Sequence, residues 1–249
     1  MKMAHAYTFV SRFLMLAMKI AGMLLTEPKA FVIHNGTDFV PYSNFKKLDN
    51  TGIVVTSVVG KEWRLKGLDI LVKVLNRVCT EHPDIAKRIS VLIVGEPPKQ
   101  VVEGIICPNV HVLKGLPKQV LKKILRKTHI LIQLSRYDSF LLPAIEATSQ
   151  GCAIIVSNRA GVAEILRDQA IIVDIKRLDD IYDALLRLIT SEELRNELSL
   201  RALKLSYDYT YDKVAKRYLL CYLNVLKQQL KQKSFSVSSR YMHKATKAF

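Results

Sequence analysis

The stretch "HILIQLSRYDSFLLPAIEATSQGCAIIVS", residues 129–157, contains the pattern that decides the fold. The apolar run 129–135 predicts a buried strand, and the run 153–157 predicts a second one. Between them, residues 143–151 predict a helix that begins near Pro143 and is closed by Gly151. Strands this apolar must be covered on both faces, which indicates a parallel sheet wrapped by helices.

The same alternation extends in both directions. Further strands are predicted at 52–60, 89–95, 109–115 and 170–174, and helices at 67–83, 117–127, 161–168, 191–206 and 211–230. We therefore predict an α/β fold with a doubly wound parallel, Rossmann-like sheet over residues 46–206. A C-terminal helix is expected over 207–230 and a basic, disordered tail over 231–249. Residues 1–45 are expected to form an amphipathic helix, a strand and a linker.

Composition limits the classes of partner. The chain has 249 residues, half of them apolar, and a formal net charge of +16. The apolar content excludes a disordered chain, and the charge indicates an anionic partner such as nucleic acid, an acidic membrane or a phosphorylated small molecule. No nucleic-acid motif or interleaving of basic and aromatic residues is visible, so nucleic acid ranks last.

Four cysteines lie at positions 79, 107, 152 and 221, without a C-x-x-C pair. This spacing predicts neither a metal site nor a disulfide framework, and Cys152 and Cys221 lie in apolar patterns typical of buried thiols. We expect a reducing, cytoplasmic setting, with peripheral contact to a membrane as an option.

The first 25 residues, "MKMAHAYTFVSRFLMLAMKIAGMLL", are apolar but are interrupted by Arg12 and Lys19. No small-residue cleavage site follows. Three interpretations remain open: a helix packed against protein, a helix lying in a membrane interface, and a signal or membrane span. We favour the first.

In doubly wound sheets, ligands bind at the carboxyl ends of the strands, here the loops 60–67, 95–99, 135–143 and 157–161. The first loop places Lys61, Arg64 and Lys66 beside a helix N-terminus, which predicts a diphosphate site. The alternative is a solvated loop, because lysines are common on surfaces.

The third loop carries two carboxylates. Asp138 follows a strand, and Glu146 lies one turn inside the next helix, where it can accept two hydrogen bonds from a ribose diol. Separately, Asp138 could be a turn cap and Glu146 a helix-dipole acid worth about 0.5 kcal/mol. Together on the ligand edge, opposite Lys61 and Lys66, they favour a binding site.

The motifs in this order resemble the C-terminal, donor-binding domain of the retaining glycosyltransferases of family 4, the glycosyl transferases group 1 with the GT-B fold. The resemblance covers residues 31–226. Its motifs are Gly60-Lys61, Lys66-Gly67, Asp138-Ser139-Phe140-Leu141-Leu142-Pro143, Glu146-Ala147, Ala160-Gly161-Val162-Ala163-Glu164, and Asn35, Gly36 and Asp38 in the linker.

The resemblance implies roles for these positions. Lys61 and Lys66 would neutralise the diphosphate of a nucleotide-sugar donor, and Asp138 would orient its sugar, so these three are the predicted catalytic residues. The predicted donor-binding residues are Gly60, Phe140, Leu141, Leu142, Glu146, Gly161 and Glu164. Among these, Glu146 would hold the ribose, the Phe140 and Leu141 amides the sugar, and the Leu142 amide a phosphate. No metal or other cofactor is expected.

The chain also departs from the family pattern. Lys61 replaces an arginine, Asp138 a glutamate, and Leu141 and Ala160 replace glycines. Residues 1–45 resemble only the last segment of the family's N-terminal acceptor domain, and His34 in the linker is expected to be structural. We predict a retaining glycosyltransferase or its donor-binding subunit, with a separate polypeptide supplying the acceptor domain. The alternative is a non-catalytic module that binds a nucleotide or a polyanion.

Overall fold

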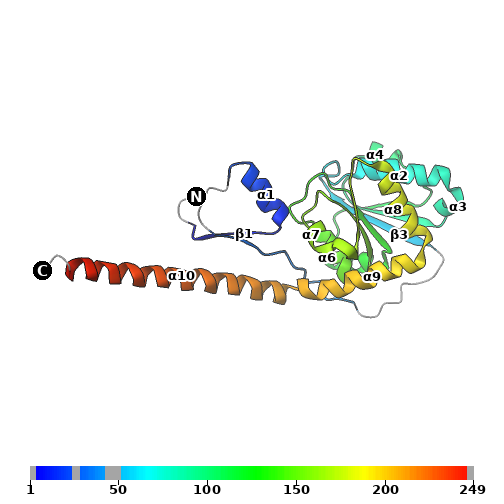
Figure 1. Ribbon diagram of the computed structural model, residues 1–249. Coiled ribbons are helices and arrows are strands. Elements are labelled where there is room, and N and C mark those ends of the chain that lie inside the picture. The colour runs from blue at the N-terminus through cyan, green and yellow to red at the C-terminus, as the bar shows by residue number, and fades with distance from the viewer. Residues whose placement is uncertain (1–3, 24–28, 43–51, 246–249) are drawn as a thin grey trace.

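The computed structural model describes residues 4–23, 29–42 and 52–245, and of residues 231–245 it describes only the backbone. The predicted boundary between residues 45 and 46 lies outside these ranges. An α/β domain forms one end of the molecule, and a long helix and a small N-terminal unit extend from it (Figure 1).

The domain is built on six parallel strands in the order β5-β4-β3-β6-β7-β8, which confirms the predicted doubly wound sheet. The chain fills one half of the sheet and then crosses to the other, so the order reverses between β3 and β6. The strands are β3 (Ile53–Gly60), β4 (Ile89–Gly95), β5 (Val110–Leu113), β6 (Ile130–Gln133), β7 (Ala153–Ser157) and β8 (Ile171–Val173).

Two apolar cores flank the sheet, one on each face. Strand residues such as Val55 and Ile132 join α2 and α8 in one core, whereas Leu131 and Ile154 join α5 and α6 in the other. This alternation explains why the strands read as continuous apolar runs. The helices and turns of the domain are α2 (Leu68–Glu81), α3 (Pro83–Ala86), α4 (Lys99–Glu103), α5 (Lys118–Lys127), α6 (Leu142–Ser149), α7 (Ala163–Leu166), η1 (Arg167–Gln169), α8 (Leu178–Thr190), α9 (Glu192–Ser206) and η2 (Tyr207–Tyr209).

The N-terminal unit has one strand more than the amphipathic helix and strand predicted for it. A strand, β1 (Ala6–Phe9), precedes α1 (Arg12–Ile20), and β1 pairs in parallel with β2 (Lys29–Val32). Ser11 separates strand from helix because its hydroxyl caps α1, accepting a hydrogen bond from the Leu14 amide at 3.0 Å. Helix α1 buries none of its residues. Within the described segments, no helix combines the length and apolar character that crossing a bilayer requires.

The predicted disordered tail is wrong as far as Ala245. Helix α10 runs from Tyr211 to Ala245, 35 residues, and residues 246–249 lie outside the description. The segment contains no glycine or proline and is rich in lysine, glutamine and leucine, which are good helix formers. Its backbone therefore continues as a helix without a core pattern.

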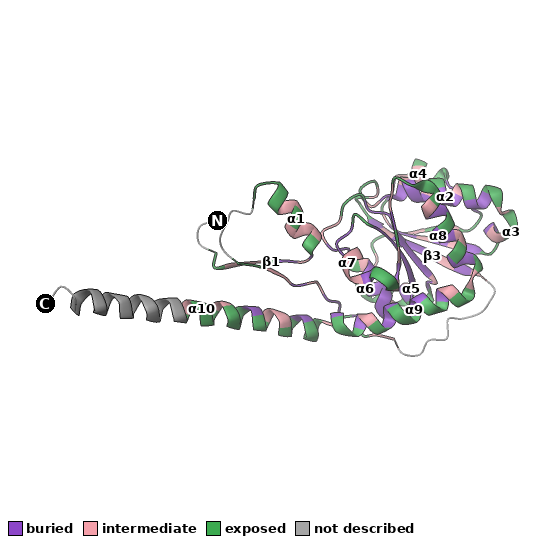
Figure 2. Cartoon of the chain, viewed as in Figure 1, coloured by how far each residue is buried: buried purple, intermediate pink, exposed green. Residues whose placement is uncertain are grey.

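Helix α10 has two apolar faces. Val214 and Cys221 are buried with Ile33 of the linker. A different face leaves Leu219, Leu223, Leu226 and Leu230 exposed. Much of the first half of α10 is coloured as exposed in Figure 2. Spacings of four, three and four residues keep these leucines on one side of the helix.

The structure also corrects the prediction for the cysteines. Cys79 at the end of α2 and Cys107 before β5 form a disulfide, with Cα atoms 5.7 Å apart. Their separation of 28 positions gave no signal, because only the packing of the loop against α2 brings the two together. Cysteine spacing therefore no longer supports a reducing compartment. Cys152 and Cys221 are free and buried, as predicted.

Candidate functional site

The sheet opens at the point where its strand order reverses. Strands β3 and β6 pair only through Val55 with Ile130 and Thr56 with Leu131. Beyond this pairing the Gln133 side chain bridges the strands, donating to the Val58 carbonyl at 3.0 Å. The Gln133 Oε1 and the Ser135 hydroxyl are buried without a hydrogen-bond partner among the described residues. Unsatisfied polar groups of this kind mark a place where a ligand or water can bind.

The loops that leave β3 and β6 lie against each other. Gly67 has a φ of +75°, and a Cβ on it would lie 2.0 Å from the Leu134 carbonyl oxygen. Only glycine fits this backbone contact. The close approach brings Lys66 of the first loop to Asp138 of the second.

Lys66 and Asp138, both predicted catalytic residues, form an ion pair through Nζ and Oδ2. The other carboxylate oxygen of Asp138 accepts a hydrogen bond from the Phe140 amide at 3.0 Å. The two groups that were predicted to bind the donor therefore bind each other here. A ligand that binds Lys66 or Asp138 would have to replace the contacts that these two side chains make within the chain.

The loop after β6 is fastened to the loop after β7. The Gly161 amide donates to the Asp138 carbonyl at 3.0 Å, and the Val162 amide donates to the Phe140 carbonyl at 2.8 Å. Leu141, where the family has glycine, is buried and adopts a left-handed φ of +76°. Leu142 follows as the first residue of α6 and is exposed.

Glu146 lies on α6 and is buried close to Lys118, a residue that was not predicted to belong to the site. Lys118 Nζ, at the start of α5, lies 3.8 Å from Glu146 Oε1 and 2.6 Å from Asp38 Oδ1. Burial raises the pKa of Glu146 above its ordinary value, and Lys118 opposes the shift. The hydrogen bond from Lys118 lowers the pKa of Asp38. Lys118 could have been found from the sequence, because it follows Pro117 at the start of a helix on the edge of the sheet where ligands bind.

Lys61 lies apart from these pairs. With Gly60 it lines a cavity of about 260 Å³ at the carboxyl ends of β3, β4 and β5, where Gly95 and Gly115 complete the wall. Its ammonium group makes no ion pair with any residue that the structure describes. The acidic Glu96 also lines this cavity.

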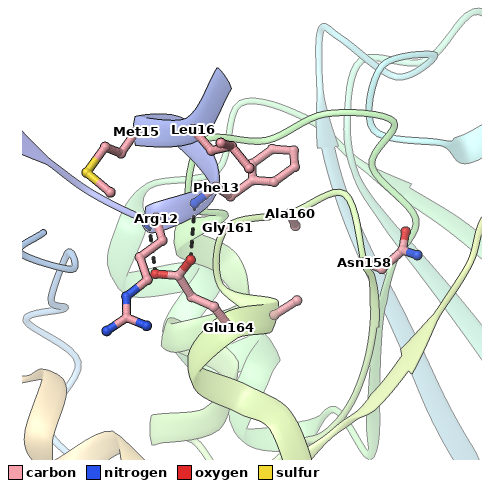
Figure 3. Close-up of a pocket in the computed structure, with 9 residues that line it drawn as sticks. Arg12, Phe13, Met15, Leu16, Asn158, Ala160, Gly161 and Glu164 are labelled. Atoms are coloured by element: carbon pink, nitrogen blue, oxygen red, sulfur yellow. Dashed lines mark hydrogen bonds between the residues drawn. The ribbon is translucent and has the colours of Figure 1, made fainter. Parts of the chain in front are cut away.

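Gly161 and Glu164 contact the N-terminal end of α1 (Figure 3). The carboxylate of Glu164 accepts hydrogen bonds from the amides of Arg12 at 2.9 Å and Phe13 at 3.2 Å, and its Oε1 also lies 2.5 Å from His34 Nε2. A Cβ on Gly161 would lie 2.5 Å from the Ser11 hydroxyl. Glu164 thus caps a helix in this structure, and its predicted contact with a donor remains a prediction.

Of the predicted site residues, Lys66 and Asp138 are therefore paired and Glu146 lies beside Lys118. Lys61 lines a separate cavity. In the ranges 4–23, 29–42 and 52–230, whose side chains the structure describes, no group of three or more His, Cys, Asp or Glu side chains is placed to hold a metal ion.

The chain matches the family model described as "Glycosyl transferases group 1" over residues 43–205. It is 26% identical over 215 residues to a phosphatidylinositol N-acetylglucosaminyltransferase subunit of Arabidopsis thaliana, covering 82% of this chain and 46% of the relative. It is also 26% identical over 225 residues to the D-inositol 3-phosphate glycosyltransferase of Actinosynnema mirum, covering 82% and 54%.

Among solved structures, the sucrose-phosphate synthase of Thermosynechococcus elongatus superposes with a TM-score of 0.74 at 17% identity, covering 90% of this chain and 59% of that one. This likeness concerns the fold alone. The chain spans about half the length of the curated relatives that it matches. The family match covers most of the α/β domain, including every predicted donor-binding loop, and the chain therefore belongs to the glycosyl transferases group 1 family.

Proposed function

We propose that this chain is the donor-binding half of a retaining glycosyltransferase that uses a nucleoside-diphosphate sugar. The observation that carries the proposal is the Lys66–Asp138 ion pair, which lies between the loops that leave β3 and β6, where the strand order reverses. Doubly wound sheets form their ligand-binding crevice at such a point. The buried, unsatisfied Gln133 and Ser135 at the end of β6 add polar groups to the same region. A cation, a carboxylate and unsatisfied polar atoms at this edge of the sheet suit a polar, anionic ligand.

In this proposal the donor diphosphate displaces Asp138 from Lys66. The ammonium group of Lys66 then neutralises the phosphate, and the freed carboxylate of Asp138 accepts hydrogen bonds from hydroxyl groups of the sugar. Lys61, just after β3, would meet the second phosphate. Negative charge that develops on the departing nucleoside diphosphate would be stabilised by these fixed cations and by backbone amides, without a metal ion.

Glu146 would hold the ribose of the donor. Its carboxylate is buried and shares Lys118 with Asp38, so a diol that enters must compete with the 3.8 Å contact to Lys118. That contact is long for an ion pair, which leaves the oxygens of Glu146 available to two donors. The base would enter the cavity beside Lys61 and Gly115.

We propose an inositol-phosphate compound as the acceptor and a second polypeptide as the source of its site. Two relatives are named for phosphatidylinositol and for D-inositol 3-phosphate, and the first of them is named as a subunit. Two surfaces support a protein partner: the exposed leucine stripe of α10 and the small β1–β2 sheet, whose parallel strands lack the cover that such strands normally have. Peripheral contact with a membrane would follow from a lipid acceptor.

One observation favours the alternative, a nucleotide-binding module without turnover. Both oxygens of Asp138 are engaged within the chain, and Leu141 places a side chain where the family has a bare backbone. Such a module would bind nucleoside diphosphates as well as nucleotide sugars and would hydrolyse neither.

A single assay separates the two functions. Purified chain is incubated with a panel of radiolabelled nucleotide sugars, with and without candidate partner proteins, and release of free sugar is measured. Slow hydrolysis of one donor that is lost in Glu146→Gln and retained in the surface variant Glu103→Gln supports the transferase. Binding of donors without release under every condition removes the enzymatic claim.

A further inference from the structure

A second cavity, of about 620 Å³, lies at the carboxyl edge of the sheet. Its walls come from the first turns of α2, the loops after β6, β7 and β8, and the first residue of α8. None of its lining residues lines the cavity beside Lys61, and none is among the predicted donor-binding residues. Its charged lining consists of Lys73, Arg136, Arg159, Lys176 and Asp69.

The charges around this cavity are unbalanced. Asp69, its one acidic lining residue, has both oxygens bound by the guanidinium of Arg136, at 2.8 and 2.7 Å. The side-chain cations of Lys73, Arg159 and Lys176 make no hydrogen bond or ion pair with any described residue. Three cations without an ion-pair partner therefore line one concave, solvent-open space and leave it with an excess of positive charge, which concentrates anions.

Nearby carboxylates form no ion pair with these three cations among the residues whose side chains the structure describes. The Asp174 Oδ1 accepts a hydrogen bond from the backbone amide of Lys176 at 3.0 Å, and Asp179 pairs with Arg77 at 2.5 Å. Asp180 pairs with Arg177 at 3.1 Å. Asp179 and Asp180 are thus paired with other cations, whereas Asp174 keeps its negative charge and lowers the local positive excess by one.

The backbone beneath the cations is held in place. The Arg136 amide donates to the Leu65 carbonyl at 2.8 Å, and the Arg159 amide donates to the Ser157 hydroxyl at 2.9 Å. The Lys176 amide is likewise bound by Asp174, so the backbone is hydrogen-bonded at three of the four basic residues of the cavity. Less ordering is then needed when a ligand binds, which favours affinity.

We propose that this cavity is a second anion site, which binds a phosphate ester separately from the donor crevice. A phosphate offers several acceptor oxygens and up to two negative charges, which matches a free guanidinium fork with two ammonium groups. Apolar Ile70, Ile175 and Leu178 line the remainder, so the space accommodates a ring beside the phosphate. The ester can be carried on a soluble compound or on a lipid headgroup.

The test uses the full chain and two triple variants of equal charge. One removes the unpaired cations of the cavity, with Lys73→Gln, Arg159→Gln and Lys176→Gln. The control removes three exposed lysines on α5 and α9, with Lys123→Gln, Lys127→Gln and Lys204→Gln. Binding of myo-inositol 1-phosphate is measured by calorimetry, and binding to phosphatidylcholine vesicles with and without phosphatidylinositol by co-sedimentation, both at low ionic strength.

The cavity variant is expected to bind at least about tenfold more weakly than the control variant. Loss of binding to the soluble phosphate supports a small phosphate ester as ligand, and loss confined to phosphatidylinositol vesicles supports a headgroup. Equal binding by the two variants, or no binding of either probe by the unmodified chain, overturns the proposal.

The outcome is separable from that of the donor site. Lys66→Gln is expected to leave binding of both phosphate probes unchanged, and the cavity variant is expected to keep its response to nucleoside diphosphates. Failure of nucleotide binding with intact phosphate binding would refute the proposed function and leave this site standing. The converse result would refute this site alone.

Discussion

Lys66 and Asp138 are joined by an ion pair between the loops that leave β3 and β6, the two strands at which the sheet order reverses. The residues are 72 positions apart in sequence, and the glycine contact at Gly67 brings their loops together. The same pair that stabilises the unliganded crevice is the one that a donor would have to open. Predictions about this region therefore couple binding with stability.

Glu146→Gln should change the pH dependence of both nucleotide binding and the free energy of unfolding. Burial raises the pKa of Glu146 above 4.5 in the folded chain. A carboxyl with a raised pKa favours folding fully below its unfolded pKa and loses that contribution as pH rises through the folded pKa. The free energy of unfolding of Glu146→Gln should therefore gain on that of the unmodified chain as pH rises through this window.

Nucleotide binding should show the opposite trend, because a ribose needs the ionised carboxylate. In the unmodified chain, affinity for a nucleoside diphosphate should rise with pH through the same window, whereas Glu146→Gln should bind about tenfold more weakly with a flat profile. Denaturant unfolding and calorimetry across pH measure the two quantities. Identical profiles in the two proteins would show that Glu146 does not hold the ligand.

Leu141 combines a strained backbone with a buried side chain. Leu141→Ala should destabilise the chain by about 3 kcal/mol, because a buried leucine is truncated at a site of 2% exposure. Leu141→Gly should be about 1 kcal/mol more stable than the alanine variant, because only glycine is unstrained at φ +76°. Urea unfolding of the two variants tests this order, and alanine as the more stable residue would contradict the left-handed conformation.

Gly60 and Gly67 form a matched pair at the ends of one loop. Both have a left-handed φ, of +57° and +75°, but a Cβ on Gly60 would meet nothing within 4 Å, whereas one on Gly67 would meet the Leu134 backbone. Gly60→Ala should cost about 1 kcal/mol and Gly67→Ala about 3 kcal/mol, since the second change adds overlap to strain. Equal losses of stability in thermal unfolding would mean that the loop after β3 does not contact the Leu134 backbone.

The disulfide between Cys79 and Cys107 should contribute measurably to stability. Closing a loop between residues 28 positions apart stabilises the fold by about 3.6 kcal/mol at 25 °C, because it lowers the entropy of the unfolded chain. Unfolding in guanidinium should shift to a lower midpoint with reductant, and a Cys79→Ser, Cys107→Ser variant should match the reduced chain with no further response. A midpoint that reductant leaves unchanged would exclude the bond.

Most of the sheet domain could be predicted from the sequence, because its strands are short, wholly apolar and separated by clear helices. Lys66 and Asp138 were predictable as neighbours, since both follow strands whose carboxyl ends share an edge. Helix α8 was missed: its sequence, 178–190, lay between the last predicted strand and the next predicted helix. Strand β1 was missed because Thr8 and Phe9 merged with the helix pattern that follows Ser11.

Contacts between segments far apart in the chain escaped prediction. Glu164 was expected at the donor, but it lies 2.5 Å from His34, 130 residues away, and caps α1. Lys118 reaches Asp38 and Glu146 from a helix that the sequence identified only as amphipathic. Sequence periodicity fixes which face of an element is buried, but it carries no information about which distant side chain meets it.

The most direct test of the central claim compares the affinity of the unmodified chain for nucleoside diphosphates and their sugars with that of Lys66→Gln and of the exposed control Lys123→Gln. If the crevice binds the diphosphate, one nucleotide should stabilise the unmodified chain by about 3 kcal/mol at a hundredfold excess over its Kd. Lys66→Gln should bind that nucleotide about tenfold or more weakly, and the control equally well. No stabilisation by any nucleotide of the panel, or equal affinity in Lys66→Gln, would contradict the account.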